Sequence, residues 1–411
     1  MTEQLVPGAG DPGAAVPEPR TAEPPPPPLP PLGTPRRRQR PALGCLLRLV
    51  GGVLTFAGAV LFIVAANRVK TVLVPTPGTV PMWQNVLVVL SVGVGAGATL
   101  LVGRRMRVRG RRHHARVVRT MEEATTGPYV LYLRPFTEDV TGTTMPHAFS
   151  RWRGVGGSLA DGSSVTLEES VCRIFRMFGS PLAVGEPDEA LPLAGARRLY
   201  LPFEDWQRTV TALIGDARLV LLVAGTSEGT LWELTEVVRL RGPGSVLILL
   251  YGDEEPYDAF RTVAERALAE RADELRQVHG PDWQPPVFPP FPGLQDPERL
   301  RWVPLMRAVI HFEEDWTPRL TLLDPTAVHA WTQEGRARKM GRTQLTPLLT
   351  RVYDRLAQEA ADAGDATGAT DSAAAGRGGE ARDGGAGGGG AAGSGAGGSG
   401  GTPTLPLDSR R

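Results

Sequence analysis

Two long apolar stretches near the N-terminal end constrain most strongly what this chain can fold into. Residues 43–66 carry a single charge, Arg48, and residues 82–103 carry none. A helix needs about 20 residues to cross the hydrocarbon core of a bilayer, and both stretches are long enough. Arg48 lies near the start of its stretch, where its long side chain can extend to the headgroups. The sequence therefore predicts two transmembrane helices joined by a short loop at 67–81.

Arginines that flank the two stretches predict their orientation. Four precede the first stretch and six follow the second, namely Arg36, Arg37, Arg38, Arg40, Arg104, Arg105, Arg107, Arg109, Arg111 and Arg112. The loop between the stretches holds only Arg68 and Lys70. Positively charged flanks stay in the cytoplasm, so we expect both termini there and the loop outside. We expect the basic segment 104–127, with His113 and His114, to face anionic lipid headgroups. A buried helical hairpin of a soluble protein is the alternative that these arginines disfavour.

Glycines inside the second stretch suggest how the two helices would pack. Gly93 and Gly97 are four residues apart and so lie on one face of a helix. Small residues at this spacing let two membrane helices approach closely. We therefore expect this face to contact the first helix.

Composition separates two tails from the rest of the chain. Residues 1–42 include five consecutive prolines at 24–28, and residues 359–411 are rich in Gly and Ala. Neither tail has enough apolar surface to fold, so we expect both to be disordered. Residues 1–120 contain 16 Lys and Arg against 4 Asp and Glu, whereas the remainder contains 29 against 40. An acidic remainder argues against nucleic acid as a partner.

Residues 128–358 show an alternation of strands and helices. Strands are expected at 129–136, 181–185, 219–224 and 246–251, and helices at 167–178, 206–214, 231–241 and 257–278. This order predicts an α/β fold with a doubly wound, mostly parallel sheet. On the first of these helices we expect Val171, Ile174, Phe175 and Phe178 to face inward and Cys172 to be a small buried residue. Segment 302–324 would add one or two strands, and a closing helix at 346–358 would have Thr346 as its N-cap.

Loops that follow the strands are where a ligand would bind, because ligands of such sheets bind at the carboxyl ends of the strands. These loops span 137–164, 186–205, 225–230 and 252–255. The second loop contains Arg197 and Arg198. They would either hold a phosphate or pair with acidic neighbours in the same loop, Glu186, Asp188 and Glu189.

Two motifs give residues 128–251 a resemblance to a known family. The first strand ends in Arg-Pro-Phe-Thr-Glu-Asp at 134–139, and the third is followed by Ser227 and Trp232-Glu233-Leu234. This pattern resembles a Toll/interleukin-1 receptor (TIR) domain. Residues 229–234 are also similar to the Gly-Thr-x-x-Glu stretch of nucleoside deoxyribosyltransferases, which have a related flavodoxin-like sheet. The chain as a whole looks like a group of bacterial two-span membrane proteins to which no activity is attached.

The resemblance implies a module for protein interaction or signalling that self-associates. It also implies an alternative, because many TIR domains cleave NAD with a glutamate of the third helix. NAD would then be a substrate, and a carboxylate would stabilise the oxocarbenium-like transition state. Glu233 is the first candidate for this catalytic role and Glu236 the second. Ligand-binding candidates are Phe136, Asp139, Arg197, Arg198, Ser227 and Trp232.

Structural roles for several of these residues remain open. Thr230 and Glu233 fit a capping box, in which Thr230 would be the N-cap of the helix. Trp232 would pack in the core rather than stack on a base, and Asp139 would form a turn. The chain has no Gly-x-x-x-x-Gly-Lys-Ser/Thr loop and no His-Glu-x-x-His motif, and its two cysteines exclude a disulfide scaffold. No group of residues has metal-ligand spacing.

Overall fold

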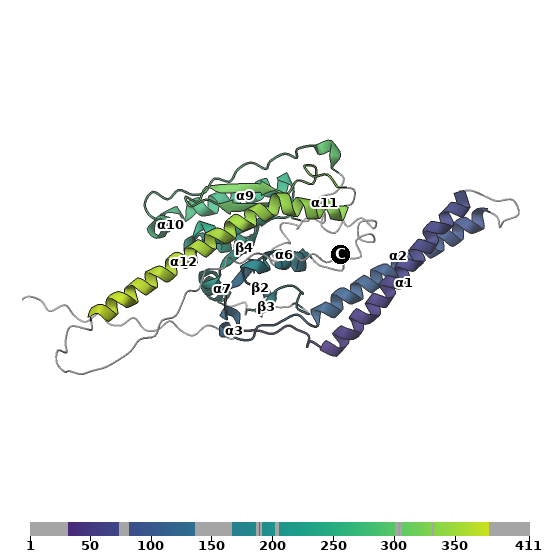
Figure 1. Ribbon diagram of the computed structural model, residues 1–411, viewed down its shortest axis with the longest axis horizontal. Helices are drawn as coiled ribbons and strands as arrows, with labels where there is room; N and C mark the ends of the chain where they lie inside the picture. The colour runs from purple at the N-terminus through teal and green to yellow at the C-terminus, as the bar shows by residue number, and fades with distance from the viewer. Residues whose placement is uncertain are drawn as a thin grey trace, which may run out of the picture. The chain divides into compact units, whose positions relative to one another are not determined.

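The computed structural model of the protein describes residues 32–73, 82–135, 167–185, 189, 191–201, 205–300, 304, 306–330 and 333–377. Its helices are α1 (Pro41–Leu73), α2 (Met82–Arg112), α3 (Met121–Thr125), α6 (Leu167–Phe175), α7 (Trp206–Asp216), α8 (Glu228–Leu240), α9 (Glu254–Glu270), α10 (Ala272–His279), α11 (Gln333–Met340) and α12 (Thr346–Arg377) (Figure 1). Its strands are β1 (Tyr129–Leu133), β2 (Ser180–Gly185), β3 (Arg197–Tyr200), β4 (Leu219–Val223), β5 (Val246–Leu250), β6 (Ala308–Phe312) and β7 (Pro318–Leu322).

The two N-terminal helices contain the predicted apolar stretches. Segments Pro41–Val69 and Trp83–Arg112 are each long and apolar enough to cross a membrane. Helix α1 continues beyond residue 66 to Leu73, and α2 continues beyond residue 103 to Arg112. The arginines that follow the second stretch therefore extend the helix rather than end it.

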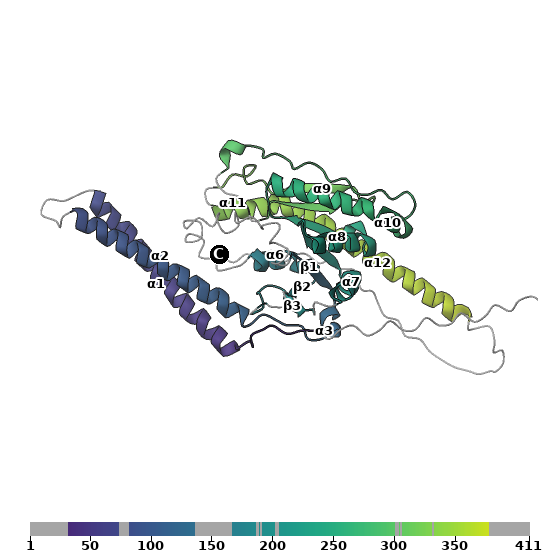
Figure 2. The ribbon, with the colours of Figure 1, turned by 180° about the vertical axis from the view of Figure 1, so that it is seen from behind.

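Glycines at intervals of seven residues bring α1 and α2 together. Gly44 and Gly51 of α1 lie opposite Gly110 and Gly103 of α2. Gly58 lies against Leu100 and the carbonyl oxygen of Ala96. A Cβ atom added to Gly51 would lie 2.6 Å from the carbonyl oxygen of Gly103, so no larger residue fits there. The helices are antiparallel and lie side by side (Figures 1 and 2). The prediction for Gly93 and Gly97 was wrong, because a Cβ atom at either position would meet nothing within 4 Å.

A seven-stranded sheet forms the core of the remainder, with the order β3-β2-β1-β4-β5-β6-β7. Strands β1 to β5 are parallel, and β6 and β7 are antiparallel to their neighbours. The four predicted parallel strands are confirmed, as are two strands within 302–324. Strand β3 was not predicted. Strands β1, β4 and β5 are buried along their whole length, as their continuous apolar sequences require.

Helices cover both faces of the sheet, which confirms the α/β class. Apolar residues of α7, α8, α9 and α10 pack on one face, and those of α6, α11 and α12 on the other. Figure 2 shows the side that carries α8, α9 and α10. On α6, Cys172 is buried as predicted, but Ile174 is 36% exposed and does not face inward.

The C-terminal helix differs from its prediction. Helix α11 continues through a π-helical turn, Gly341–Leu345, directly into α12. Thr346 has helical dihedral angles (φ −56°, ψ −44°), and its hydroxyl donates to the carbonyl oxygen of Gly341 at 3.0 Å. Thr346 is therefore not an N-cap. Helix α12 also extends to Arg377, into the tail that was expected to be disordered from residue 359.

Segments on either side of the α1–α2 pair are joined to strand β3. Before α1, the Gly33 amide donates to the Tyr200 carbonyl at 2.8 Å. After α2, the amide of Val118 donates to the carbonyl of Arg198 at 2.7 Å, and the Arg198 amide donates to Arg116 at 2.8 Å. Residues 32–40, part of the leader that was expected to be disordered, are thus described, and Gly33 among them pairs with the sheet. Residues 1–31 lie outside the described part.

Candidate functional site

The carboxyl ends of the parallel strands bring three loops to one edge of the sheet. Strand β1 is followed by Arg134 and Pro135, β4 by residues 224–227, and β5 by residues 251–253. Strands β1 and β4 are neighbours, but the chain continues from β1 to β2 on one side and from β4 to β5 on the other. A crevice for a ligand is expected at such a reversal. The two loops are in close contact, since a Cβ atom on Gly225 would lie 2.9 Å from Cγ of Pro135.

Ser227 begins α8 at this edge. Its hydroxyl oxygen accepts from the backbone amide of Thr230 at 3.3 Å and lies 3.0 Å from the Thr230 hydroxyl. Ser227 is therefore the N-cap, and Thr230 lies inside the helix and is 2% exposed. The predicted capping box with Thr230 as N-cap was wrong, because the helix begins three residues earlier than that box requires.

Ser227 also stands at the centre of a motif that the sequence reasoning missed. Residues 225–229 read Gly-Thr-Ser-Glu-Gly, which is the Gly-x-Ser-x-Gly spacing of a nucleophile elbow between a strand and a helix. In such an elbow the serine has a strained backbone that exposes its hydroxyl. Ser227 instead has extended dihedral angles (φ −72°, ψ 151°), and its hydroxyl is used to cap α8. The loop matches the elbow in spacing but not in geometry.

Glu233 is buried in the second turn of α8. It is 5% exposed and lies between Thr230 and Val237 on one side of the helix, both of which are buried. Since Ser227 caps the helix, Glu233 has no role as the reciprocal member of a capping box. A carboxylate here is close to the carboxyl edge of the sheet and screened from water.

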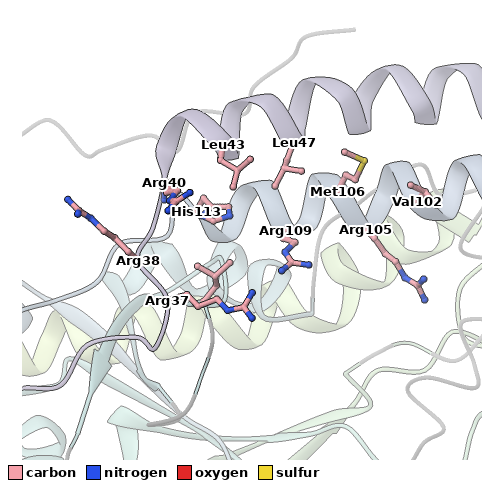
Figure 3. Close-up of a pocket in the computed structure, with 11 residues that line it drawn as sticks. Arg37, Arg38, Arg40, Leu43, Leu47, Val102, Arg105, Met106, Arg109 and His113 are labelled. Carbon is pink, nitrogen blue, oxygen red and sulfur yellow. Dashed lines mark hydrogen bonds between the residues drawn. The ribbon is translucent and has the colours of Figure 1, made fainter.

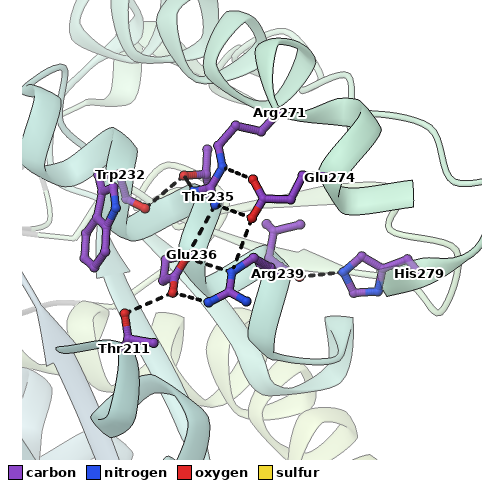
Figure 4. A network of polar contacts seen from close by, with 9 residues as sticks. Thr211, Trp232, Thr235, Glu236, Arg239, Arg271, Glu274 and His279 are labelled. Atoms are coloured by element: carbon purple, nitrogen blue, oxygen red, sulfur yellow. Dashed lines mark hydrogen bonds and ion pairs between the residues drawn. The ribbon is translucent and has the colours of Figure 1, made fainter. Parts of the chain in front are cut away.

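Glu236, the second catalytic candidate, belongs to a polar network that joins four helical segments (Figure 4). It accepts from Thr211 of α7 at 3.0 Å and from Arg239 of α8 at 2.9 and 2.5 Å. Arg271, where α9 ends and α10 begins, lies 3.6 Å from it and donates to Thr235 at 2.7 Å. Burial alone would raise the pKa of Glu236, but the hydrogen bonds from Arg239 and Thr211 outweigh it and lower that pKa. Both carboxylate oxygens are therefore engaged in holding helices together.

Arg271 explains why the predicted helix 257–278 is divided. Its backbone leaves the helical region (φ −101°, ψ 13°), so that α9 ends at Glu270 and α10 begins at Ala272. Glu274 accepts from Arg271 at 2.8 and 2.7 Å. The break thus directs the Arg271 guanidinium toward the middle of α8.

Trp232 lies on the same helix and is half-buried. Its ring packs edge-on against Trp206 of α7, with 5.0 Å between ring centroids and an interplanar angle of 75°. Both rings border the apolar core on that face of the sheet. The packing interpretation of Trp232 therefore has the structural support, since the contact joins α7 to α8.

Arg197 and Arg198 lie on strand β3 and not in a loop. Arg197 donates to the carbonyl oxygens of Glu123 and Ala124 at 2.8 and 2.9 Å, which ties β3 to the end of α3. Arg198 is fully buried and donates to both carboxylate oxygens of Glu168 on α6 at 2.6 and 2.5 Å. In the structure both arginines bind groups of the α/β domain, and neither pairs with Glu189. The other two predicted partners, Glu186 and Asp188, lie outside the described residues.

Further polar residues at the carboxyl edge were not predicted. The hydroxyls of Tyr132 and Tyr251 lie 3.3 Å apart, and burial raises the pKa of Tyr132 to about 12. Arg307, just before β6, is 5% exposed, and its Nε lies 2.8 Å from the carboxylate of Asp253. Within the described residues its Nη1 has no hydrogen-bond partner. In the sequence, a tyrosine within an apolar strand gives little indication of a functional site, and an isolated arginine gives none.

Two candidates cannot be placed. Phe136 and Asp139, with the loop 137–164, lie outside the described residues. Across the described ranges, no group of three or more His, Cys, Asp or Glu could hold a metal ion.

The two histidines after α2 differ in their surroundings. His113 is 7% exposed, and its Nδ1 accepts from the backbone amide of Arg40 at 3.3 Å. Burial lowers the pKa of His113, and Arg109, His114 and Arg40 lower it further. His113 is therefore largely buried by the protein itself rather than exposed on the basic surface. His114 is exposed, with Nε2 3.6 Å from Sγ of Cys45.

Comparison of the chain with protein families, characterised proteins and solved structures finds no match. The candidate site therefore rests on its own geometry.

Proposed function

We propose that the protein is a two-span membrane protein whose α/β domain, on the cytoplasmic side, is a TIR-like module for protein interaction or signalling. One observation carries this proposal. The segments that enter and leave the α1–α2 pair are both hydrogen-bonded to strand β3, so the apolar helices are attached directly to the sheet. A flexible tether would only anchor a domain, whereas an attachment at two points can transmit a movement of the helices.

Ion pairs strengthen this attachment. Arg111 at the end of α2 contacts Glu169 of α6 at 2.6 Å, and Arg112 lies 3.4 Å from Glu189. The Gln39 side chain donates to the carbonyl oxygens of Arg112 and Ala115 at 3.2 and 2.7 Å. The basic ends of the helices thus meet acidic groups of the domain, which is consistent with a cytoplasmic position for the domain.

The strand order supports a TIR-like arrangement. Without β3, the parallel strands follow the order β2-β1-β4-β5, which corresponds to the start of the flavodoxin-like order. Strand β3 would then be an added edge strand, and the antiparallel β6 is a departure from the flavodoxin-like order. Such modules act by associating with copies of themselves, and we extend that expectation to this domain.

Membrane insertion and orientation test the proposal together. The full chain should pellet with membranes after an alkaline carbonate wash. A cysteine introduced at position 76, within the predicted outer loop, should react with an impermeant maleimide added to intact cells. Cysteine introduced at exposed Arg266 of α9 should react only after permeabilisation. Recovery of the chain in the soluble fraction, or the reverse labelling pattern, would contradict the proposal.

A second candidate function is N-glycosidic cleavage of NAD or a related nucleotide, with Glu233 as the catalytic carboxylate. Its support is that Glu233 is buried near the carboxyl edge and is not used as a cap. Arg307 at the same edge offers a guanidinium nitrogen that is unpartnered within the described residues, as a phosphate would require. In low dielectric, a nearby carboxylate strongly stabilises a developing cation.

Release of nicotinamide from NAD by the full chain in detergent or vesicles would test this second function. We expect Glu233→Gln to abolish release while the melting temperature stays close to that of the native chain. Glu236→Gln is the matched control, since it removes a carboxylate that lies one helical turn from Glu233 and is held by Arg239. Equal loss of activity in both variants, or no release by the native chain, would exclude Glu233 as a catalytic residue.

A further inference from the structure

A cavity of about 640 Å³ lies where α1 begins and α2 approaches its end (Figure 3). Five arginines line it, namely Arg37, Arg38, Arg40, Arg105 and Arg109. The rest of its wall is mainly apolar, with Leu43 and Leu47 from α1 and Val102 and Met106 from α2. His113 and, from the α/β domain, Leu191 complete the lining. Cavities of roughly 300–1,000 Å³ are the usual size for small-molecule sites. The cavity therefore combines a concentrated positive charge with an apolar wall.

The charge of these five arginines is not neutralised by the described residues. None of them forms an ion pair there, although the neighbouring Arg111 and Arg112 pair with Glu169 and Glu189. The arginines near the ends of the helices thus fall into two groups. One group binds acids of the α/β domain, and the other lines the cavity without an acid in the described part of the chain.

The apolar wall indicates which kind of anionic ligand would balance the charge of these arginines. Leu43, Leu47, Val102 and Met106 belong to the segments that are long enough to cross a membrane. A soluble phosphate compound would gain nothing from this wall, whereas the acyl chains of a lipid would pack on it. Guanidinium groups bind phosphate through paired hydrogen bonds, and five of them exceed what one phosphate can accept.

We propose that this cavity binds one anionic phospholipid that carries two phosphates, with the phosphates on the five arginines and the acyl chains along the leucine and methionine wall. This inference rests on the proposed membrane insertion. It goes further in naming a stoichiometric site, in place of a general attraction between basic residues and an anionic surface. Basic pockets at the cytoplasmic ends of membrane helices bind such lipids.

Lipid preference at matched charge tests the site. The full chain would be reconstituted into vesicles of phosphatidylcholine alone, with phosphatidylglycerol, or with half as much diphosphatidylglycerol, so that the last two carry equal charge. Native mass spectrometry of the extracted protein should show one diphosphatidylglycerol per chain. Its affinity should exceed that for phosphatidylglycerol by about tenfold, which corresponds to about 1.4 kcal/mol.

Two double variants separate the cavity from the surrounding charge. Arg105→Gln with Arg109→Gln should abolish the tenfold preference, since both side chains are exposed and their loss leaves the helix packing intact. Arg116→Gln with Arg119→Gln removes the same charge from exposed positions outside the cavity and should leave the preference unchanged. An equal effect of both variants would overturn the site in favour of diffuse attraction.

Two other outcomes would also overturn it. Displacement of the lipid by micromolar inositol hexakisphosphate would assign the cavity to a free polyphosphate. Insertion into all three vesicles without lipid preference would remove the site but leave the membrane proposal intact, whereas failure to associate with any vesicle would remove both.

Discussion

Arg198 and Glu168 form a buried ion pair between the edge strand β3 and helix α6. The Arg198 guanidinium is fully buried, and Glu168 is 6% exposed. Nη2 of Arg198 lies 2.6 and 2.5 Å from the two carboxylate oxygens, and Nη1 donates to the carbonyl oxygen of Val184 at 3.2 Å. The pair holds together three elements that the sequence separates, β2, β3 and α6. Since β3 also carries the attachment to α1 and α2, this pair supports that attachment from the inside of the domain.

Loss of one partner should be costly. Arg198→Met leaves a buried carboxylate without its counter-ion, and we expect about 3–5 kcal/mol of destabilisation in chemical unfolding of the α/β domain. The double variant with Glu168→Leu should recover most of that loss, because no buried charge remains. If Arg198→Met alone leaves the unfolding midpoint unchanged, the pair does not support the domain.

The seven-residue glycine pattern predicts a sharp contrast between two substitutions in the apolar helices. Gly51→Leu would overlap the backbone of α2 and should destabilise the helix pair by about 1–3 kcal/mol, measured by thermal unfolding in detergent. Gly97→Leu is the control and should have no such effect, because nothing lies within 4 Å of the added Cβ atom. Equal sensitivity at the two positions would mean that α1 and α2 pack through another face.

Glu236 should contribute to stability in a pH-dependent manner. Its pKa in the folded chain is lowered from an ordinary value of 4.5, so its contribution is complete above that value and is lost as the pH falls through the lowered pKa. Glu236→Gln should cost about 1–3 kcal/mol at neutral pH, since Arg239 and Arg271 lose a buried acceptor. The variant should also show a flatter dependence of melting temperature on pH below 4.5. If the melting temperature of the variant depends on pH below 4.5 as steeply as that of the native chain, Glu236 is not responsible for this dependence.

His311 on β6 should destabilise the fold in mild acid. Burial, together with the nearby charges of Arg351 and Arg355, lowers its pKa from 6.5 to about 4. The nearby groups Glu313 and Arg319 have opposite effects on this pKa. Because the unfolded chain binds the proton more readily, stability falls as the pH drops from 6.5 toward 4. His311→Gln should reduce that decline in melting temperature, and an identical decline in the variant would contradict the assignment.

The parallel strands could be predicted because their sequences are decisive. Residues 219–223 and 246–250 are uninterrupted apolar runs between helices, a pattern typical of strands buried on both faces. Strand β3 could not be found this way, because half of its four residues are arginines. Arg198 is tolerated there only because Glu168 lies opposite, and that contact depends on the tertiary fold.

The candidate site shows a similar division. The edge of the sheet and the start of α8 near Ser227 follow from the order of elements, whereas the roles of individual side chains do not. Thr230 and Ser227 both fit the pattern of an N-cap, and only the backbone decides between them. Gly44, Gly51 and Gly58 did carry a signal, since their spacing of seven matches that of Gly103 and Gly110 on α2.

The pairing of Gly33 and Val117 with β3 has a consequence for how this domain can aggregate or recruit others. An open strand edge invites extension by a foreign strand. Here the open edge of β3 is covered by the two segments of chain that lead into α1 and out of α2. A partner that docks by lengthening the sheet must therefore come to β7, at the opposite margin. A movement of α1 and α2 that separated these segments from β3 would expose its edge. The sheet would then have a second edge to which a partner strand could bind.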